Sequence, residues 1–202
     1  MKYLSILLLF CLFSTTIQAQ TLDDINATRF RHTKNGSIAL TSWAGANITG
    51  GTIGYLATPK GEWKHFHEMN VYFNIVNLGL GIPGLFAKKD KQMGLTLEQT
   101  VKRQYQIETV YLFNGALDLT YITAGLLMRE MGKNNPDQAT QDRWKGFGTS
   151  MMVQGGFLLV FDFVKYGIHK ANGKRIDSEW KKVSVSPYGA YGLGLSMTYR
   201  LD

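Results

Sequence analysis

Cysteine is almost absent from the 202-residue chain, and the single one, Cys11, lies in an apolar N-terminal stretch. Residues 1–19 carry Lys2, an apolar run and the small residue Ala19, which is the layout of a secretory signal peptide cleaved after residue 19. Without residues 1–19 the chain has no cysteine, which excludes a disulfide, a thiol nucleophile and a thiolate metal site. No lipobox precedes the cleavage position, so a lipoprotein is not indicated.

The sequence also lacks the motifs of common enzymes: GxSxG, HExxH and the P-loop do not occur. The glycines of 79–84 match GxGxxG, but they follow an apolar helix-like run and include Pro83, which favours helix packing and a kink over dinucleotide binding. His65 and His67 are two residues apart and point to opposite sides of a helix, so we expect no metal site. We predict no catalytic residue, no metal and no cofactor.

Acidic residues are fewer than basic ones, and the formal net charge is +7 at pH 7. The Lys and Arg side chains lie between apolar segments instead of on one face, which is typical of contact with lipid headgroups. This pattern predicts a lipid bilayer as the main partner and argues against nucleic-acid binding.

Apolar segments of about twenty residues recur four times, long enough for helices that cross a hydrocarbon layer of about 30 Å. They cover residues 38–57, 69–87, 109–128 and 147–168. Polar linkers and turn signals separate them. The pattern predicts an all-α membrane protein, a four-helix transmembrane bundle within a domain of residues 20–172.

Two further elements are expected outside these segments. Residues 96–107 have Leu97, Val101 and Tyr105 at four-residue spacing, with Thr96 and Gln99 as a capping box. This pattern predicts either a short amphipathic helix on the membrane surface before the third span or a leader into that span. In the C-terminal region of residues 173–202, the alternation over Val183–Leu201 predicts a β-hairpin with its turn at Pro187–Gly192.

Polar side chains interrupt the apolar segments and are the only candidates for chemistry. They are Glu68, Asn70, Asn74, Asn77, Asn114, Asp118, Gln154 and Asp162, of which the last six form the predicted intramembrane cluster. One interpretation is a proton or ion path, or a small polar ligand site, because intramembrane carboxylates are commonly functional. The interpretation that we favour is structural, in which these groups form hydrogen bonds across helices and fix which helices pair.

Small side chains recur at four-residue spacing in the first segment. They are Ser42, Ala46, Gly50 and Gly54. Such a line lets the backbone of another helix approach closely, so it predicts a helix-packing surface.

The signal peptide and the positive-inside rule predict opposite orientations in the membrane. If the signal is cleaved, the loops at 58–66 and 129–145 lie inside, yet most Lys and Arg residues are then outside, against the positive-inside rule. The spans are then unusual inner-membrane helices, or the protein is exported beyond the inner membrane, or the segments are strands of a small barrel. Their length argues against strands, which need only about 9–11 residues. The sequence therefore does not decide between the inner and the outer membrane as the location of the protein.

One residue pair and three sequence segments together resemble those of a known protein family. They are the pair Trp43 and Asn47, FHEMNVYFNIVNLGL at 66–80, YLFNGALDLTY at 111–121 and GFGTSMMVQGGFLLVFDFVKYGIH at 146–169. Over residues 22–172 the chain resembles an uncharacterised family of small bacterial envelope proteins, found largely in Bacteroidota and classed as a domain of unknown function. The resemblance implies four membrane helices and no known activity.

From these observations we predict a non-enzymatic integral membrane protein of the bacterial cell envelope. It is expected to be a structural or accessory subunit that assembles with an envelope protein partner or with copies of itself. The alternative is a small transport or channel element that uses Asp118 and Asp162.

Overall fold

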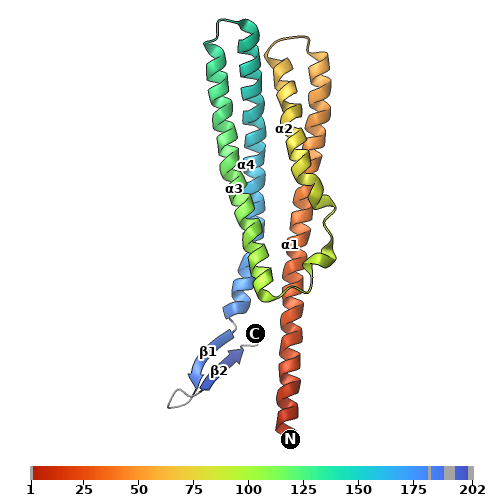
Figure 1. Cartoon of the computed structure of the whole chain (residues 1–202), viewed down its shortest axis with the longest axis vertical. Coiled ribbons are helices and arrows are strands. Elements are labelled where there is room, and N and C mark those ends of the chain that lie inside the picture. The colour runs from red at the N-terminus through yellow and green to blue at the C-terminus, as the bar shows by residue number, and fades with distance from the viewer. Residues whose placement is uncertain (1, 182, 189–193, 200–202) are drawn as a thin grey trace.

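Four long helices make up most of the chain (Figure 1). The computed structural model describes the backbone of residues 2–181, 183–188 and 194–199, and the side chains of residues 21–178. The elements are α1 (Lys2–Ala57), α2 (Glu62–Leu85), the 3-10 helix η1 (Lys89–Gln92), α3 (Leu97–Lys133), α4 (Gln138–Lys181), β1 (Val183–Tyr188) and β2 (Gly194–Tyr199). The predicted all-α helical bundle is therefore confirmed.

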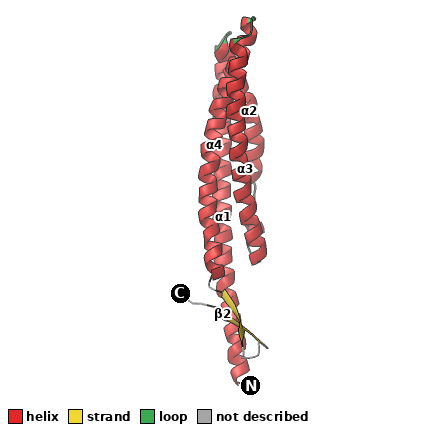
Figure 2. Cartoon of the chain, turned by 90° about the vertical axis from the view of Figure 1, so that its left-hand side faces the viewer, coloured by secondary structure: helices red, strands yellow, loops and turns green. Residues whose placement is uncertain are grey.

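The helices form two antiparallel pairs, α1 with α2 and α3 with α4 (Figures 1 and 2). The two short loops, at 58–61 and 134–137, lie at the same end of the bundle, and the connection from α2 to α3 lies toward the other end. Helix α4 packs against both α1 and α2. Helices α2 and α3 are not packed closely along their lengths, but they meet through side chains such as the rings of Phe73 and Tyr121, whose centroids are 5.2 Å apart. The bundle is therefore loosely packed on the side between α2 and α3.

Helix α2 is shorter than its neighbours. Its 24 residues span about 36 Å, whereas the 37 residues of α3 span about 55 Å. Beyond the end of α2, the helices α1, α3 and α4 continue together, joined by bonds such as Asn26 Nδ2 to Thr100 Oγ1 at 3.0 Å and Asn172 Nδ2 to the Ile25 carbonyl at 3.2 Å. We call this part, residues 22–35, 97–108 and 169–176, the three-helix extension.

Residues 96–107 form the leader into the third span, which is the second of the two predicted alternatives, and not a separate amphipathic helix. The capping box is present, since Gln99 N–H donates to Thr96 Oγ1 and Gln99 Oε1 accepts from Thr96 N–H, but the helix that it opens continues to Lys133. No Gly or Pro separates residue 107 from the third apolar segment, so nothing ends the helix there. Residues 97–108 belong to the three-helix extension.

The predicted C-terminal hairpin also needs correction. The sequence assigned Pro187 to the turn, whereas Pro187 pairs with Leu195 in the antiparallel register and β2 ends at Tyr199. Proline lacks an N–H and is tolerated only on edge strands, and a two-stranded sheet has no other kind. Among the described elements, these strands contact only α4, so they add no layer to the all-α bundle.

The bundle has an inverted polarity. Polar and charged side chains outnumber apolar ones among its buried residues, and Gln154, Asn74 and His169 are fully buried. By contrast, Leu56 is 77% exposed and Phe86 is 78% exposed. Proteins that fold in water bury their large apolar side chains, so this arrangement is typical of a bundle surrounded by lipid. Two described helices, α3 and α4, are long and apolar enough to cross a membrane.

The packing surface predicted for the first segment is mostly wrong. Ser42, Ala46 and Gly50 are exposed, and only Gly54 contacts a neighbour, the ring of His67. Steps of four residues rotate by about 40° past one turn, so a line built from them winds away from its partner. The buried positions Ala44 and Gly51 are seven residues apart, a spacing that stays on one side of the helix.

Candidate functional site

One face of α4 carries a buried polar line along almost its whole length. Its members are Ser150, Gln154, Asp162, Lys165, His169 and Asn172. They are spaced by three, four or eight residues, with Leu158 filling the widest gap, so they stay on one helical face. The other helices contribute polar groups at three levels along this line.

The first level is a network of amides from α1, α2 and α4. Gln154 Oε1 accepts from Trp43 Nε1 at 2.8 Å, and Gln154 Nε2 donates to the side-chain oxygens of Asn47 and Asn70. Asn70 Nδ2 donates to Asn47 Oδ1 at 3.0 Å, and the Trp43 indole stacks on Phe157 with ring centroids 3.7 Å apart. The network therefore ties three helices together at one point.

Two of the predicted polar residues extend this network along α2. Asn74 Nδ2 donates to the Asn70 carbonyl at 2.8 Å, and Asn77 Nδ2 donates to Asn74 Oδ1 at 3.3 Å. Asn77 is 3% exposed and lines the cavity described below. The amides thus lead from the Gln154 network to the second level.

The second level is a pair of carboxyl groups. Asp118 on α3 and Asp162 on α4 are 2% and 5% exposed, and their carboxyl groups lie next to each other. Asp118 Oδ2 is buried without a hydrogen-bond partner among the described residues.

Beside the carboxyl pair lies a cavity of about 670 Å³ between the two helix pairs. Asn114, the sixth predicted polar residue, is half-buried and lines it together with Asn77, Asp118 and Asp162. The rest of the wall is mainly apolar, with aromatic rings such as Tyr72 and Phe73. The structure therefore brings four of the six predicted residues to one cavity, whereas Asn74 and Gln154 lie outside its wall.

At one end of the cavity, Gly36 makes room for two polar side chains. A β-carbon on Gly36 would lie 3.0 Å from the Tyr111 hydroxyl oxygen and 3.1 Å from Lys165 Nζ. Lys165 donates to the backbone carbonyl of His32 on α1. The absence of a side chain at residue 36 thus lets α3 and α4 place a hydroxyl and an amino group against α1.

The third level lies in the three-helix extension. His169 is fully buried, stacks on Tyr111 with ring centroids 5.3 Å apart, and neither ring nitrogen has a hydrogen-bond partner among the described residues. Burial lowers the pKa of His169 to about 3, and the charges of Lys165, His32 and Arg29 act in the same direction. His169 is therefore neutral at pH 7.

Arg29 is the buried cation of the three-helix extension, and it is 4% exposed. Its guanidinium donates to the Thr100 carbonyl at 3.2 Å and to Gln92 Oε1 at 3.4 Å. Burial lowers the pKa of Arg29 to about 10, with Arg103 adding to the effect, so Arg29 remains charged at pH 7. The bonds from Arg29 hold η1 and the start of α3 against α1.

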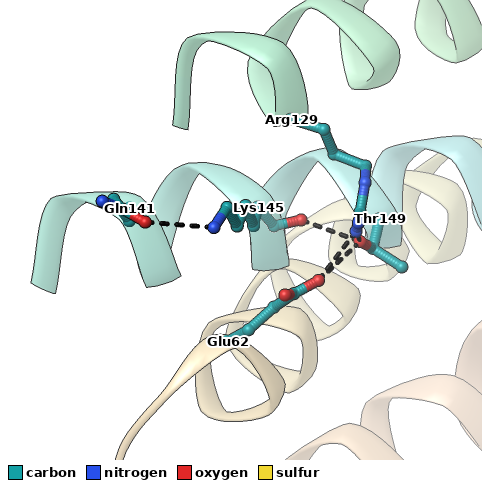
Figure 3. Close-up of polar contacts among 5 residues, drawn as sticks. All are labelled: Glu62, Arg129, Gln141, Lys145 and Thr149. Carbon is teal, nitrogen blue, oxygen red and sulfur yellow. Dashed lines mark hydrogen bonds and ion pairs between the residues drawn. The ribbon is translucent and has the colours of Figure 1, made fainter. Parts of the chain in front are cut away.

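At the opposite end of the bundle, an ion pair joins three helices (Figure 3). Arg129 Nη1 donates to Glu62 Oε1 at 2.7 Å and also contacts Thr149, whose hydroxyl donates to the Lys145 carbonyl at 2.8 Å. Lys145 Nζ in turn donates to Gln141 Oε1 at 3.1 Å. Glu62 and Arg129 are partly exposed, so this cluster marks the boundary between the loop end and the interior.

The histidines of the second segment do not meet at one site. His65 Nδ1 lies 2.8 Å from Glu68 Oε2, whereas His67 packs against Gly54. No group of three or more His, Cys, Asp or Glu side chains that could hold a metal ion occurs among the described residues. The geometry assigns both histidines to helix packing.

Sequence reasoning missed much of the polar interior. The missed residues are Asn26 and Arg29 of α1, Thr100, Gln104 and Glu108 of α3, and Ser150, Lys165, His169 and Asn172 of α4. A signal was available in α3, because Thr100, Gln104 and Glu108 precede Tyr111 and Asp118 at steps of three, four or seven residues. These three residues were missed because candidates were expected only within the apolar segments, and the third segment begins at residue 109.

The fold and site define a class of protein: a four-helix bundle with an apolar surface, a polar interior and a cavity at its carboxyl pair. Residues 39–163 match the family described as Family of unknown function (DUF6992), and the chain belongs to it. This confirms the expected membership of an uncharacterised family, over a shorter range than the resemblance to residues 22–172 suggested. No curated protein and no solved structure matches the chain.

Proposed function

We propose that this chain is an integral membrane protein in which all four helices cross the bilayer. The observation that carries the proposal is the inverted polarity: Val160 and Leu80 are 65% and 69% exposed, while Gln154 and Asn74 are fully buried. In water such a bundle would expose its apolar surface and bury polar groups at a cost, whereas lipid satisfies both conditions. The three-helix extension then stands outside the hydrocarbon layer.

Thiol labelling tests the spanning arrangement without interference, since Cys11 is the only cysteine of the sequence. In a Cys11→Ser background, Lys60→Cys and Lys91→Cys place a thiol at opposite ends of the bundle. In sealed vesicles, a membrane-impermeant maleimide should label only one of the two positions before lysis. Labelling of both positions from the same side, or release of the chain by alkaline carbonate, contradicts the proposal.

We further propose that the protein is a non-enzymatic structural or accessory subunit of a bacterial cell-envelope assembly. The signal-like layout of residues 1–19 favours export, and the hydrogen-bonded groups of the Gln154 network favour a structural role for the interior. Fractionation of inner and outer membranes, followed by cross-linking and purification of the native protein, tests this role. A monomer that yields no stoichiometric companion from either membrane contradicts it.

A second candidate function is a small transport or channel element centred on Asp118 and Asp162. The observation that favours it is the buried carboxyl pair, in which Asp118 Oδ2 has no hydrogen-bond partner among the described residues. The double substitution Asp118→Asn and Asp162→Asn preserves size and hydrogen bonding. If proton or ion flux into proteoliposomes disappears while association with a partner survives, transport is the function. If neither changes, transport is excluded.

A further inference from the structure

We propose that the cavity between α2 and α3 binds a single-chain, lipid-soluble alcohol whose hydroxyl group donates a hydrogen bond to Asp118. This inference depends on the membrane location proposed above, because the molecule would enter sideways from the lipid. It adds a ligand class that neither the structural role nor the transport role specifies.

The shape of the cavity supports lateral entry. The backbones of α2 and α3 are not packed closely together, Phe73 and Tyr121 meet across the gap with ring centroids 5.2 Å apart, and α1 and α4 form the remaining walls. The cavity-lining residues Tyr72, Val76 and Leu80 of α2 are 53%, 62% and 69% exposed, and Val110 on the α3 side is 50% exposed. These side chains are therefore both walls of the cavity and part of the surface that faces the lipid. The volume of about 670 Å³ lies within the range of small-molecule sites, about 300–1,000 Å³.

The polar end of the cavity selects the head of the ligand. Asp118 Oδ2 is buried, and no donor reaches it among the described residues, which is costly unless a ligand supplies one. A hydroxyl group can donate to this oxygen, whereas a carboxylate or phosphate head cannot and would be repelled by the carboxyl pair. The amino group of Lys165 lies beside Gly36 at one end of the cavity, where it would oppose a cationic head. A neutral donor therefore fits best.

The apolar wall selects the body of the ligand. Met69 and Phe73 line it from α2, Leu117 and Tyr121 from α3, and Leu158 from α4. Such a wall takes an alkyl or isoprenoid chain. The geometry thus matches a ligand with one hydroxyl head at Asp118 and one apolar chain.

Matched probes and matched variants test the site. The probes are hexadecan-1-ol and hexadecanoate, which share a chain and differ in the head, and binding is measured by native mass spectrometry of the full chain in nanodiscs. The variants are Val76→Trp, which fills the cavity from α2, and Val160→Trp, which adds the same ring at a similarly exposed position outside the cavity wall. We expect the chain to retain hexadecan-1-ol at least tenfold better than hexadecanoate, and Val76→Trp alone to abolish retention.

The Asp118→Asn variant provides a second test, in which the preference for the alcohol over the carboxylate is measured. It leaves the chain-binding wall intact but removes the acidic group, so the preference for the alcohol over the carboxylate should fall at least fivefold. Equal retention of the two probes by the unsubstituted chain, or unchanged retention in Val76→Trp, overturns the proposal. So does a bound phospholipid in place of the alcohol. A chain that proves integral by thiol labelling but fails these tests refutes only the site, whereas a chain that does not span the membrane refutes the proposed function first.

Discussion

Gly125 of α3 and Gly148 of α4 meet backbone to backbone. A β-carbon on Gly125 would lie 2.6 Å from the Gly148 carbonyl oxygen, and a β-carbon on Gly148 would overlap the Gly125 carbonyl in the same way. Seven residues further along α4, a β-carbon on Gly155 would lie 3.0 Å from the Asp118 carbonyl oxygen. The close crossing of α3 and α4 is thus what brings Asp118 and Asp162 within reach of each other.

Gly125→Val should separate α3 from α4 and destabilise the protein. Because the nearest atoms are backbone, the helices must move apart, and overpacking of this kind costs about 1–3 kcal/mol. Gly156→Val is the matched control, since nothing lies within 4 Å of its β-carbon position. Thermal melts of both variants in the same detergent measure the difference, and equal melting temperatures would refute the close crossing.

Gly51→Val should weaken the pairing of α1 with α2. Its β-carbon would lie 2.9 Å from a methyl group of Val71 and 3.1 Å from the His67 carbonyl oxygen, whereas no atom lies within 4 Å of a β-carbon on Gly50. Val at residue 50 should therefore be tolerated. Denaturant titrations of the two variants distinguish the observed packing face from the one suggested by the Ser42, Ala46, Gly50 line, which predicts the opposite order.

Gln154→Leu should destabilise the bundle through the amide network. The change removes the partner of Trp43 Nε1 and leaves the buried Asn70 amide short of a donor, at a cost of about 1–3 kcal/mol. Thr123→Val is the control, because the Thr123 hydroxyl is exposed and bonds only to the Leu119 carbonyl of its own helix. Reversible unfolding in mixed micelles measures both. A loss no larger than that of Thr123→Val would show that the network contributes little to stability.

His169 should make the protein sensitive to acid. The folded-state pKa of about 3 lies below the unfolded value of about 6.5, so the unfolded chain binds more protons between these values. The stability contribution of neutral His169 is therefore present above about pH 6.5 and is lost as the pH falls toward 3. Melting temperatures measured from pH 7 to pH 4 should fall less steeply for His169→Gln than for the unsubstituted chain. Parallel curves would mean that His169 does not control the effect.

Local signals in the sequence were sufficient for the helical bundle and its loops. Thr58-Pro59 and the run at 134–137 end α1 and α3 because Pro and Asn favour turns, and Thr96 caps α3 through its hydroxyl. The same reasoning failed at Pro187, because whether a proline is tolerated in a strand depends on which edge is left unpaired. At residues 96–107 it left two alternatives, because amphipathic spacing does not say whether a membrane or another helix covers the apolar face.

The sequence by itself determined that this chain forms long helices with polar groups inside apolar segments, because helix period and apolar length are properties of neighbouring residues. Tertiary structure alone decided which small residues touch and where the loose packing between α2 and α3 leaves a cavity. Those outcomes depend on how rigid helices cross, and a crossing selects one of several faces that the spacing of residues leaves equivalent. Gly50 and Gly51 differ by one position in the chain, yet only Gly51 meets another helix.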